Sequence, residues 1–407
     1  MANRFVSSLP GKIGAVCSSA PMPPRLVYLV TEDWYFVSHR LPMARAAARA
    51  GFEVHVATRV AKHRAAIERE GFVLHPLTWQ RGSLDPLHLT AIVRDVRKLY
   101  RSLRPALAHH VALAPTIVGS LAALGMEFPQ LNALAGLGFA YTSSGPKARV
   151  VRPVFSMLLR GLLRRPTATV LVQNPDDRKA LQTIGVPGNK IVLVPGSGVD
   201  TENLQPLPER PGPITIGFVG RLLHDKGVAA LVAAHQLLRE RGNPLQLLIA
   251  GEADPANPAS ISASTLTEWK RLEGIEFLGH ADFRDVWRRA HIAVLPSRRE
   301  GLPLSLLEAA ACARPLVATD VPGCREIARA NESALLVAPD DPPALADALA
   351  QLAADADLRR RLGAGARHLV ETEFSAARIG DEITALYLRL IQSGAPNAAQ
   401  SSVNLPL

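Results

Sequence analysis

Cysteine, aromatic side chains and long hydrophobic runs are all scarce in this chain of 407 residues. Its three cysteines, Cys17, Cys312 and Cys324, form no C-x-x-C pair and no disulfide framework, which is typical of a protein of a reducing cytoplasm. Aromatic residues make up only 5% of the chain, which disfavours the stacking surfaces that bind single-stranded nucleic acids. No run of about 18 uncharged apolar residues predicts a membrane-spanning helix. The nearest segment, residues 111–125, is predicted to be a buried helix.

Several nucleotide-binding signatures are also missing. Without G-x-G-x-x-G the sequence lacks the main support for dinucleotide binding, and without G-x4-G-K-[ST] it has no P-loop. No acid pair of the D-x-D type is predicted to hold a metal. Residues 1–24 have no continuous apolar segment, so we expect an unstructured extension there rather than a signal peptide.

Charge divides the chain into two unlike halves. Residues 1–200 carry a net charge of +14 and residues 201–407 a net charge of −4, within a total of +10. The basic half predicts an anionic partner for that half alone. The length, with 48% hydrophobic residues, allows two domains that each have a core.

Short apolar runs alternate with helical patterns along both halves. Predicted strands of the first half include residues 26–30, 52–57 and 72–77, and predicted helices between and after them include 41–50 and 62–70. This alternation predicts an α/β fold with parallel sheets covered by helices on both faces. A Pro-rich segment, 204–213, predicts the domain boundary, after which the pattern restarts. We therefore expect an extension over 1–24, a first domain over 25–200, a second domain over 201–375, a helix returning to the first domain over 376–391 and a loose tail over 392–407.

The stretch from Ile292 to Ile327 carries the strongest functional pattern. A predicted buried strand leads into the loop S-R-R-E-G, and Pro303 opens an apolar helix. The free N–H groups at a helix start favour phosphate. Glu300 in the loop and Glu308 in the helix suit sugar hydroxyls, which donate to ionised carboxylates. The stretch predicts a nucleotide-sugar site, although an ordinary strand–loop–helix with two surface acids fits the same pattern.

The segment E-G-L-P-L-S-L-L-E resembles the E-x7-E signature of family 4 retaining glycosyltransferases, whose fold is GT-B: two Rossmann-like domains with parallel sheets facing across a cleft. P-S-R-R-E-G-L-P through V-P-G-C-R-E-I is similar to the bacterial branch that acts on undecaprenyl-diphosphate-linked acceptors. The resemblance covers about Leu26 to Ile391. It implies a nucleotide-diphospho-sugar donor, with UDP as the expected nucleotide, bound mostly by the second domain, and an acceptor held by the first.

A second motif, G-R-x5-K, opens the second domain after its first predicted strand. Its two cations beside a helix start fit ordinary solvated surface residues as well, but the resemblance places Arg221 and Lys226 on the donor diphosphate. It also implies that Glu308 holds the ribose and Glu300 a donor-sugar hydroxyl. The predicted donor-binding residues are Gly220, Arg221, Lys226, Glu300, Gly301, Leu304, Ser305 and Glu308. Because cations and N–H groups can stabilise the leaving diphosphate, we expect no obligatory metal and no cofactor besides the donor.

The loop T-E-D-W-Y-F-V-S-H-R follows the first predicted strand, at the sheet edge where such folds bind ligands. It could be an ordinary solvated loop, but a closely similar motif recurs in the resembled family. The acceptor candidates are Asp33, Trp34, Ser38, His39 and Arg40.

The predicted strand Ala106 to Val111 ends near a histidine pair. In the resembled family the last histidine of D-x-x-H-x-H faces the donor sugar. Alignment on the following Ala-Pro implies His110 for that role, with His109 as the second choice; Pro105 and Ala108 depart from the family pattern. Together with Glu300, Arg221 and Lys226, His110 completes the predicted catalytic set.

Residues 147–165 mix six basic side chains with Val, Leu, Met and Phe and contain no acid. A basic, apolar helix of this kind is typical of one that lies on an anionic membrane surface. Each cation near such a surface is worth about 1 kcal/mol. The other interpretation is a core helix with solvated basic residues.

These features predict a retaining hexosyltransferase that moves a sugar from a UDP-sugar to a polyprenyl-diphosphate-linked saccharide, at the cytoplasmic face of the inner membrane. Three alternatives remain: a glycosyltransferase with a soluble acceptor, another nucleotide-sugar enzyme such as an epimerase, and a nucleic-acid binder that uses the high pI. The last leaves Glu300 and Glu308 unexplained, so we expect no nucleic-acid partner.

Overall fold

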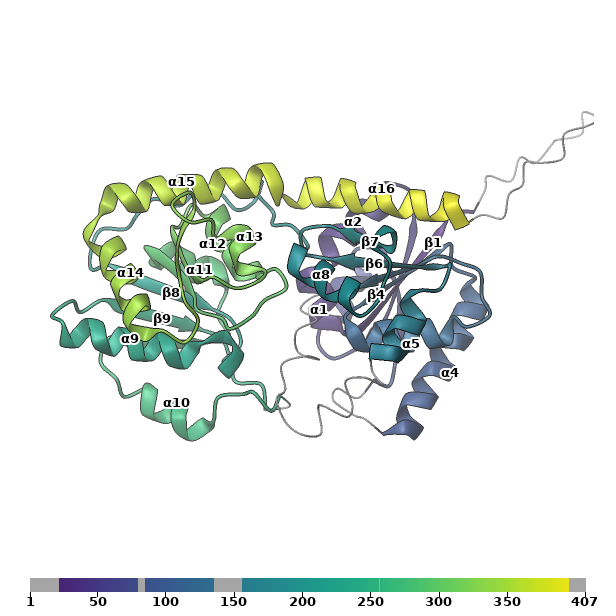
Figure 1. Cartoon of the computed structure of the whole chain (residues 1–407), viewed down its shortest axis with the longest axis horizontal. Coiled ribbons are helices and arrows are strands. Elements are labelled where there is room, and N and C mark those ends of the chain that lie inside the picture. The colour runs from purple at the N-terminus through teal and green to yellow at the C-terminus, as the bar shows by residue number, and fades with distance from the viewer. Residues whose placement is uncertain (1–21, 80–84, 135–155, 256, 395–407) are drawn as a thin grey trace, which may run out of the picture.

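The computed structural model describes residues 22–79, 85–134, 156–255 and 257–394. Two parallel sheets form two domains, which lie side by side in Figure 1. The first sheet has the strand order β3-β2-β1-β4-β5-β6-β7 and the second β10-β9-β8-β11-β12-β13. Parallel strands with helical crossovers on both faces confirm the α/β, GT-B prediction.

The strands of the first domain are β1 (Arg25–Glu32), β2 (Glu53–Arg59), β3 (Val73–Pro76), β4 (Leu107–Val111), β5 (Gln130–Ala133), β6 (Ala168–Val172) and β7 (Ile191–Leu193). Its helices are α1 (Asp33–His39), α2 (Leu41–Arg49), α3 (Arg64–Glu68), α4 (Pro86–Leu103), α5 (Leu113–Ala122) and α8 (Pro175–Thr183), with a 3-10 turn η1 at Gly188–Lys190. Residues 156–163 are also helical.

Side chains of the central strand β1 alternate between two cores, as the two-residue period of a strand requires. Leu26, Tyr28 and Val30 lie in the core that contains residues of α1 and α2. Val27 and Leu29 lie in the opposite core, with residues of α4 and α5. Both faces of this sheet are therefore covered, which is why its strands read as nearly continuous apolar runs.

The second domain contains β8 (Thr215–Val219), β9 (Gln246–Ala250), β10 (Ile275–Gly279), β11 (Ile292–Leu295), β12 (Leu316–Thr319) and β13 (Ala334–Val337). Its helices are α9 (Val228–Glu240), α10 (Ala263–Trp269), α11 (Phe283–Arg289), α12 (Leu304–Ala311), α13 (Cys324–Ile327), α14 (Pro342–Ala354) and α15 (Ala356–Glu373), with a 3-10 turn η2 at His224–Lys226. Helix α9 packs on α14, and α12 packs on α15.

The chain crosses between the domains twice, and the two crossings pair with each other. Val199 donates its N–H to the carbonyl of Phe374 and accepts from the N–H of Ala376, both at 2.8 Å. After the second crossing, α16 (Ala376–Gly394) lies on the first domain against α2, as Figure 1 shows in yellow. Tyr387 of α16 is fully buried there and hydrogen bonds to Tyr28. The predicted boundary at residue 200 lies between β7 and β8.

The structure differs from the sequence-based expectation at one element that bears on the site. Residues 31–40 were predicted as a loop, but Asp33–His39 form helix α1. Its N-cap, Glu32, makes no side-chain capping bond, so the usual sequence signal for a helix start is absent. The predicted buried helix within 111–125 is present as α5. Among the helices of the described ranges, none has a stretch long and apolar enough to cross a bilayer.

Candidate functional site

Strand β11, the following loop and α12 form the expected strand–loop–helix. Pro303 is the N-cap of α12, and it contributes no side-chain capping bond. The backbone N–H groups of the first turn, at Leu304 and Ser305, therefore keep no side-chain cap and lie at the positive end of the helix dipole. The geometry is that of an anion-binding helix start.

Lys226 and Glu300, predicted to bind phosphate and sugar, contact each other. Lys226 Nζ donates to Glu300 Oε1 at 2.5 Å, and Ser297 Oγ donates to the same oxygen at 2.7 Å. The two side chains are 21% and 10% exposed, so each is open enough to exchange this partner for a ligand. The ion pair holds both groups beside the start of α12.

A glycine makes this approach possible. Gly227 follows η2 with a φ of +70°, and a Cβ atom there would lie 1.9 Å from the carbonyl oxygen of Pro296. Only glycine lets the start of α9 pack directly against the loop between β11 and α12. Gly323 of the Pro-Gly turn approaches the same loop, since its Cβ would lie 2.5 Å from the carbonyl oxygen of Gly301.

Arg221 follows β8 and Gly220, and its guanidinium pairs with Asp254 at 3.1 Å. Its side chain is 42% exposed and reaches a cavity shared with the first domain. His39 of the first domain lies near enough to feel both second-domain cations. Burial, and then the charges of Arg40, Lys226 and Arg221, lower the pKa of His39 to about 3, so its ring is neutral at pH 7.

Glu308 lies on α12 with 9% of its surface exposed. Burial raises the pKa of Glu308 to about 8, and the nearby charge of Arg284 opposes that rise. A carboxyl in such a position gains from hydroxyl donors that satisfy its ionised form.

The acceptor candidates of α1 divide into structural and exposed residues. Asp33 is completely buried and accepts from the backbone N–H groups of Trp34 (2.7 Å), Ala61 (2.7 Å) and His63 (2.9 Å). These bonds lower the pKa of Asp33 despite its burial. The expectation of an acceptor contact at Asp33 is thus corrected: its carboxylate ties α1 to the segment after β2.

Arg40 is 1% exposed and donates to Ser197 Oγ at 3.0 Å, so its guanidinium braces the first domain rather than facing a ligand. Ser38 is exposed and bonds to the carbonyl of Trp34 and to His39 Nδ1. The His39 ring stacks on Tyr35 with a centroid distance of 4.2 Å. Of the five candidates, Trp34, Ser38 and His39 keep surface that a ligand can reach.

The structure also corrects the position of His110. Its ring is fully buried, with Nε2 bonded to Tyr100 Oη at 2.9 Å and Nδ1 to Asn132 Oδ1 at 2.8 Å. Both ring nitrogens are therefore occupied within the core. His109, the second choice, points to the opposite face and bonds to Tyr387 Oη at 2.6 Å. At the end of β4 it is Val111, with the following Ala112, that lines the cavity.

That cavity has a volume of 270 Å³ and is lined by residues of both domains. Its lining residues are Val30, Thr31, Glu32, Trp34, Tyr35, Trp79, Val111, Ala112 and Ala114 of the first domain and Arg221 of the second. Glu32, Trp79 and Val111 were not among the predicted site residues. Glu32 stands inside the quoted T-E-D-W-Y-F motif, whereas no sequence signal marked Trp79.

Direct contacts between the domains lie at the same junction. Asn174 Nδ2 donates to the carbonyl of Gly301 at 2.8 Å. A Cβ atom on Gly196 would lie 2.3 Å from Leu302. The loop that carries Glu300 is thus held against the ends of β6 and β7.

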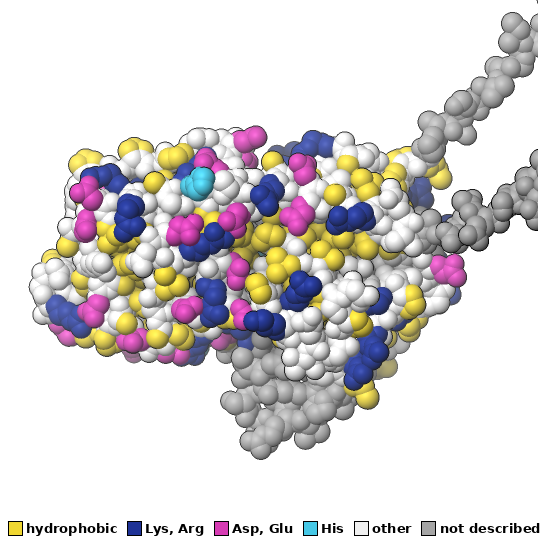
Figure 2. Space-filling view, turned by 45° about the horizontal axis from the view of Figure 1, so that its top comes forward, with side chains coloured by type: hydrophobic (Ala, Val, Ile, Leu, Met, Phe, Trp, Pro, Cys, Tyr) yellow, Lys and Arg dark blue, Asp and Glu magenta, His cyan; other side chains and the backbone are white. Residues whose placement is uncertain are grey.

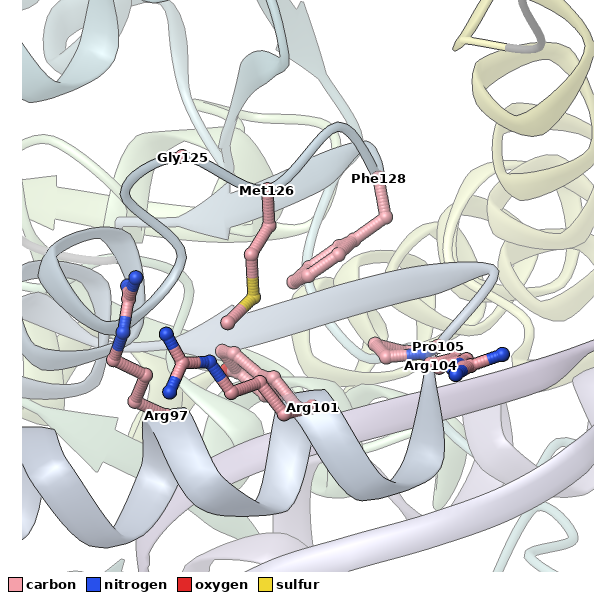
Figure 3. Close-up of a pocket in the computed structure, with 8 residues that line it drawn as sticks. Arg97, Arg101, Arg104, Pro105, Gly125, Met126 and Phe128 are labelled. Atoms are coloured by element: carbon pink, nitrogen blue, oxygen red, sulfur yellow. The ribbon is translucent and has the colours of Figure 1, made fainter.

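A larger cavity, of 540 Å³, lies elsewhere on the first domain (Figure 3). Three arginines, Arg97, Arg101 and Arg104, line it together with Met126 and Phe128. The guanidinium ends of Arg97 and Arg101 lie side by side below Met126, and Arg104 lies on the far side of Phe128. No second-domain residue lines this cavity, so it is separate from the donor residues.

No group of three His, Cys, Asp or Glu side chains among the described residues could hold a metal ion. The sequence contains one D-x-D spacing, Asp355-Ala-Asp357. Asp355 caps α15 by accepting from the N–H of Leu358 at 2.8 Å, and Asp357 pairs with Arg360. Both acids thus belong to a helix start.

Known proteins resemble this chain along most of its length. It is 26% identical over 383 residues to the putative glycosyltransferase EpsD of Bacillus subtilis, which covers 90% of this chain and 97% of the relative. It is 24% identical to N,N'-diacetylbacillosaminyl-diphospho-undecaprenol alpha-1,3-N-acetylgalactosaminyltransferase of Campylobacter jejuni, with 87% and 96% covered. It is 28% identical to alpha-maltose-1-phosphate synthase of Mycolicibacterium smegmatis, with 84% and 95% covered.

Solved structures share the fold. Sucrose-phosphate synthase of Thermosynechococcus elongatus superposes with a TM-score of 0.76 at 22% identity, over 91% of this chain and 100% of that one. Anabaena Alr3699/HepE in complex with UDP gives a TM-score of 0.72 at 16% identity, over 90% and 100%.

Two family models match separate halves of the chain. Residues 25–174 match the model described as glycosyl transferase 4-like, and residues 213–355 match the model of glycosyl transferases group 1. The chain is therefore a glycosyltransferase of the GT-B fold, with a glycosyl transferase 4-like first half and a group 1 second half.

Proposed function

We propose that this glycosyltransferase transfers a hexosyl group, with retention, from a UDP-sugar to a polyprenyl-diphosphate-linked saccharide. One observation carries the donor half of the proposal: Lys226, Glu300 and the uncapped start of α12 converge in the second domain. A diphosphate needs cations and N–H donors, and a sugar needs carboxylates, and this junction supplies both.

The donor would replace the internal ion pair. In the proposed complex Lys226 and Arg221 bind the diphosphate, and the N–H groups of Leu304 and Ser305 stabilise the charge that grows as it leaves. Glu300, freed from Lys226, accepts from a donor-sugar hydroxyl, and Glu308 accepts from the ribose. The Anabaena structure of the same fold was solved with UDP, which is the nucleotide we propose. In this scheme the cations do the work of a metal ion, and we expect full activity in EDTA.

The acceptor proposal rests on charge and on one relative. The first 200 residues carry a net charge of +14, which suits an anionic diphosphate lipid. The Campylobacter relative is named for an undecaprenyl-diphosphate-linked substrate. A soluble acceptor is the second candidate, since the Mycolicibacterium relative is named for a sugar phosphate product without a lipid.

A membrane-facing surface on the first domain would present such an acceptor. Residues 147–155 of the predicted membrane helix lie outside the described residues, but 156–165 are described. Met157 is 70% and Leu158 41% exposed, beside exposed Arg160 and Arg164. Large apolar side chains exposed in this way are typical of interfacial helices.

Hydrogen bonds link the arginine cavity of Figure 3 to the same segment. Arg97 donates to the carbonyls of Ala122 (2.8 Å) and Leu124 (2.7 Å) at the end of α5. Arg165 donates to the neighbouring carbonyl of Ala123 at 3.3 Å. Both basic segments therefore meet at one helix end, although Lys and Arg side chains are visible over both domains in the face that Figure 2 shows. We propose that this face rests on the cytoplasmic surface of the inner membrane.

The test is a transfer assay with a panel of UDP-sugars against two acceptors, farnesyl-diphosphate-linked N-acetylglucosamine and free N-acetylglucosamine, read by mass spectrometry. We expect one UDP-sugar to extend the diphosphate-linked acceptor, and NMR of the product to show the donor's anomeric configuration. Transfer to the free sugar alone would favour the soluble-acceptor candidate. Transfer from no UDP-sugar to either would overturn the proposal.

A further inference from the structure

Glu32, the last residue of β1, carries a carboxylate that is only half satisfied. The residue is 4% exposed. Its Oε2 accepts from Arg59 Nη2 at 2.7 Å and from Arg59 Nε at 3.1 Å. Its Oε1 is buried and has no hydrogen-bond partner among the described residues. A buried carboxylate oxygen without a donor is costly, so this oxygen calls for a donor that the described chain does not supply.

Glu32 lines the 270 Å³ cavity between the domains. Trp34, Tyr35 and Trp79 supply aromatic walls, and Val111 and Ala112 supply small apolar ones. Small-molecule sites usually measure about 300–1,000 Å³ and combine apolar walls with a few placed polar groups. At 270 Å³ the cavity lies just below that range, which suits one sugar ring rather than a whole lipid-linked acceptor.

Arg221 of the second domain also lines the cavity. This is the cation to which we assign the donor diphosphate, so a molecule in the cavity lies between the first domain and the leaving group. Glu32, which lines the same cavity, comes from the first domain, to which we assign the acceptor. The cavity therefore combines one predicted donor contact with an acid of the acceptor domain.

We propose that this cavity is the acceptor-sugar subsite, with Glu32 Oε1 accepting a hydrogen bond from an acceptor hydroxyl while Trp34 and Trp79 contact the faces of the ring. The proposal rests on the proposed function and adds a specificity-determining residue to it. Arg59 holds the other carboxylate oxygen and so orients Glu32.

A purely structural role for Glu32 is the competing explanation. A second ion pair between the same two strands serves as the comparison. Glu32 and Arg59 join the carboxyl ends of β1 and β2. At the other ends, Arg25 and Glu53 form the equivalent pair at 2.9 Å. Glu53 is 35% exposed, against 5% for the Glu32 side chain, and it lines none of the cavities described above. If both pairs only join strands, the loss of neither should change the acceptor KM.

The experiment compares Glu32→Gln with Glu53→Gln in the full-length chain. Steady-state rates are measured with varied farnesyl-diphosphate-linked N-acetylglucosamine at saturating UDP-sugar, and UDP binding is measured by calorimetry. We expect Glu32→Gln to lower kcat/KM for the acceptor by about 10- to 100-fold, chiefly through KM, because a hydrogen bond to a charged group is lost. Glu53→Gln is expected to keep the wild-type acceptor KM.

Equal acceptor KM values for the wild type and Glu32→Gln would overturn the subsite while leaving the proposed function intact. A wild-type protein that transfers no sugar would instead overturn the proposed function itself. If Glu32→Gln fails to fold, Glu32→Asp keeps the charge but withdraws it by one methylene group. A folded Glu32→Asp with unchanged acceptor KM would overturn the proposal equally.

Discussion

At the residue scale, the contact between Lys226 and Glu300 decides how the donor site behaves when empty. The two charges neutralise each other at 2.5 Å, so neither is left unpaired beside the helix start. In the proposed complex donor binding breaks this pair, and the diphosphate and the sugar hydroxyl each replace one partner. The arrangement makes Lys226 a test of the donor proposal.

We predict that Lys226→Ala lowers kcat by about 10²- to 10³-fold, the usual cost of losing one group that stabilises a developing anion. Stability should change little, because Glu300 keeps its bond from Ser297 and partly exposed ion pairs contribute little. Rates and thermal melts measure the two effects. Arg241→Ala, which breaks an exposed pair with Asp347, is the matched control and should leave the rate unchanged. A wild-type rate in Lys226→Ala would remove that residue from the phosphate site.

The burial of Glu308 leads us to expect that the stability of the fold depends on pH. Its pKa is raised to about 8 in the folded chain, above the ordinary value of about 4.3 for an unfolded glutamate. The folded state therefore favours the protonated form, and this contribution to stability is complete at low pH and is lost as the pH rises towards 8. We expect the melting temperature to fall between pH 5 and pH 8 by more in the wild type than in Glu308→Gln, whose side chain stays neutral.

The same variant tests the ribose role through a different measurement. Because Glu308→Gln cannot offer an ionised acceptor, we expect a higher donor KM at pH 8. An equal fall in melting temperature between pH 5 and pH 8 for the two proteins would contradict the burial argument. An unchanged donor KM would contradict the contact with ribose.

At the scale of the element, α9 has a glycine with a left-handed backbone conformation at each end, and only one of the two lies against another part of the chain. Gly227 and Gly242 both have positive φ, +70° and +79°. A Cβ on Gly227 would meet the carbonyl of Pro296 at 1.9 Å, whereas nothing lies within 4 Å of one on Gly242. An alanine would therefore be strained in its backbone at both positions, but it would collide with a neighbouring segment only at position 227.

We predict that Gly242→Ala lowers the free energy of unfolding by about 1 kcal/mol, the ordinary cost of a left-handed alanine. Gly227→Ala should cost clearly more and should also raise the donor KM, because the start of α9 must move away from the loop that holds Glu300. Denaturant unfolding and donor kinetics measure both. Equal losses in the two variants would show that the contact with Pro296 has no energetic weight.

Element patterns also show what the sequence could predict. Helix α2 and strands β2 and β3 lie within one or two residues of their predicted bounds, because apolar runs between clear turn residues leave little choice. Helix α1 was missed because its start has no side-chain cap. His110 was assigned to the donor sugar, but its side chain lies in the core. Side chains alternate between the two faces of a strand, so a shift of one residue in the alignment moves the chosen side chain from the cavity to the core, and Val111 lines the cavity instead. Arg59, 27 residues away, binds one oxygen of Glu32 and leaves the other without a partner among the described residues, and a local sequence pattern could not predict this arrangement.

At the scale of the whole molecule, the exposed apolar side chains are distributed as unequally as the charge. Met157, Leu158, Leu87 and Leu124 are all exposed on the first domain. Within the described ranges the large exposed hydrophobic residues lie on that domain or on α16, which packs against it. Charge and apolar surface therefore point to the same domain as the membrane-facing one.

We predict that Arg160→Gln with Arg164→Gln weakens binding to anionic vesicles. Each cation near such a surface is worth about 1 kcal/mol, so the pair should lower the partition coefficient roughly 30-fold. Arg165 is left in place because it donates to the carbonyls of Ser120 and Ala123 at the end of α5, and its removal would disturb the fold. Flotation with vesicles containing phosphatidylglycerol measures the effect, at low and high salt, since screening should weaken the wild type more than the variant.

The matched control neutralises two exposed arginines of the second domain, Arg241 and Arg288. It makes the same change in net charge but on the domain to which we assign no membrane contact. If net charge alone drove association, both double variants would lose binding equally. If the first domain docks as a surface, only Arg160→Gln with Arg164→Gln should be released, and rates with the farnesyl-linked acceptor in solution should stay at the wild-type level because neither arginine lines the cavity between the domains.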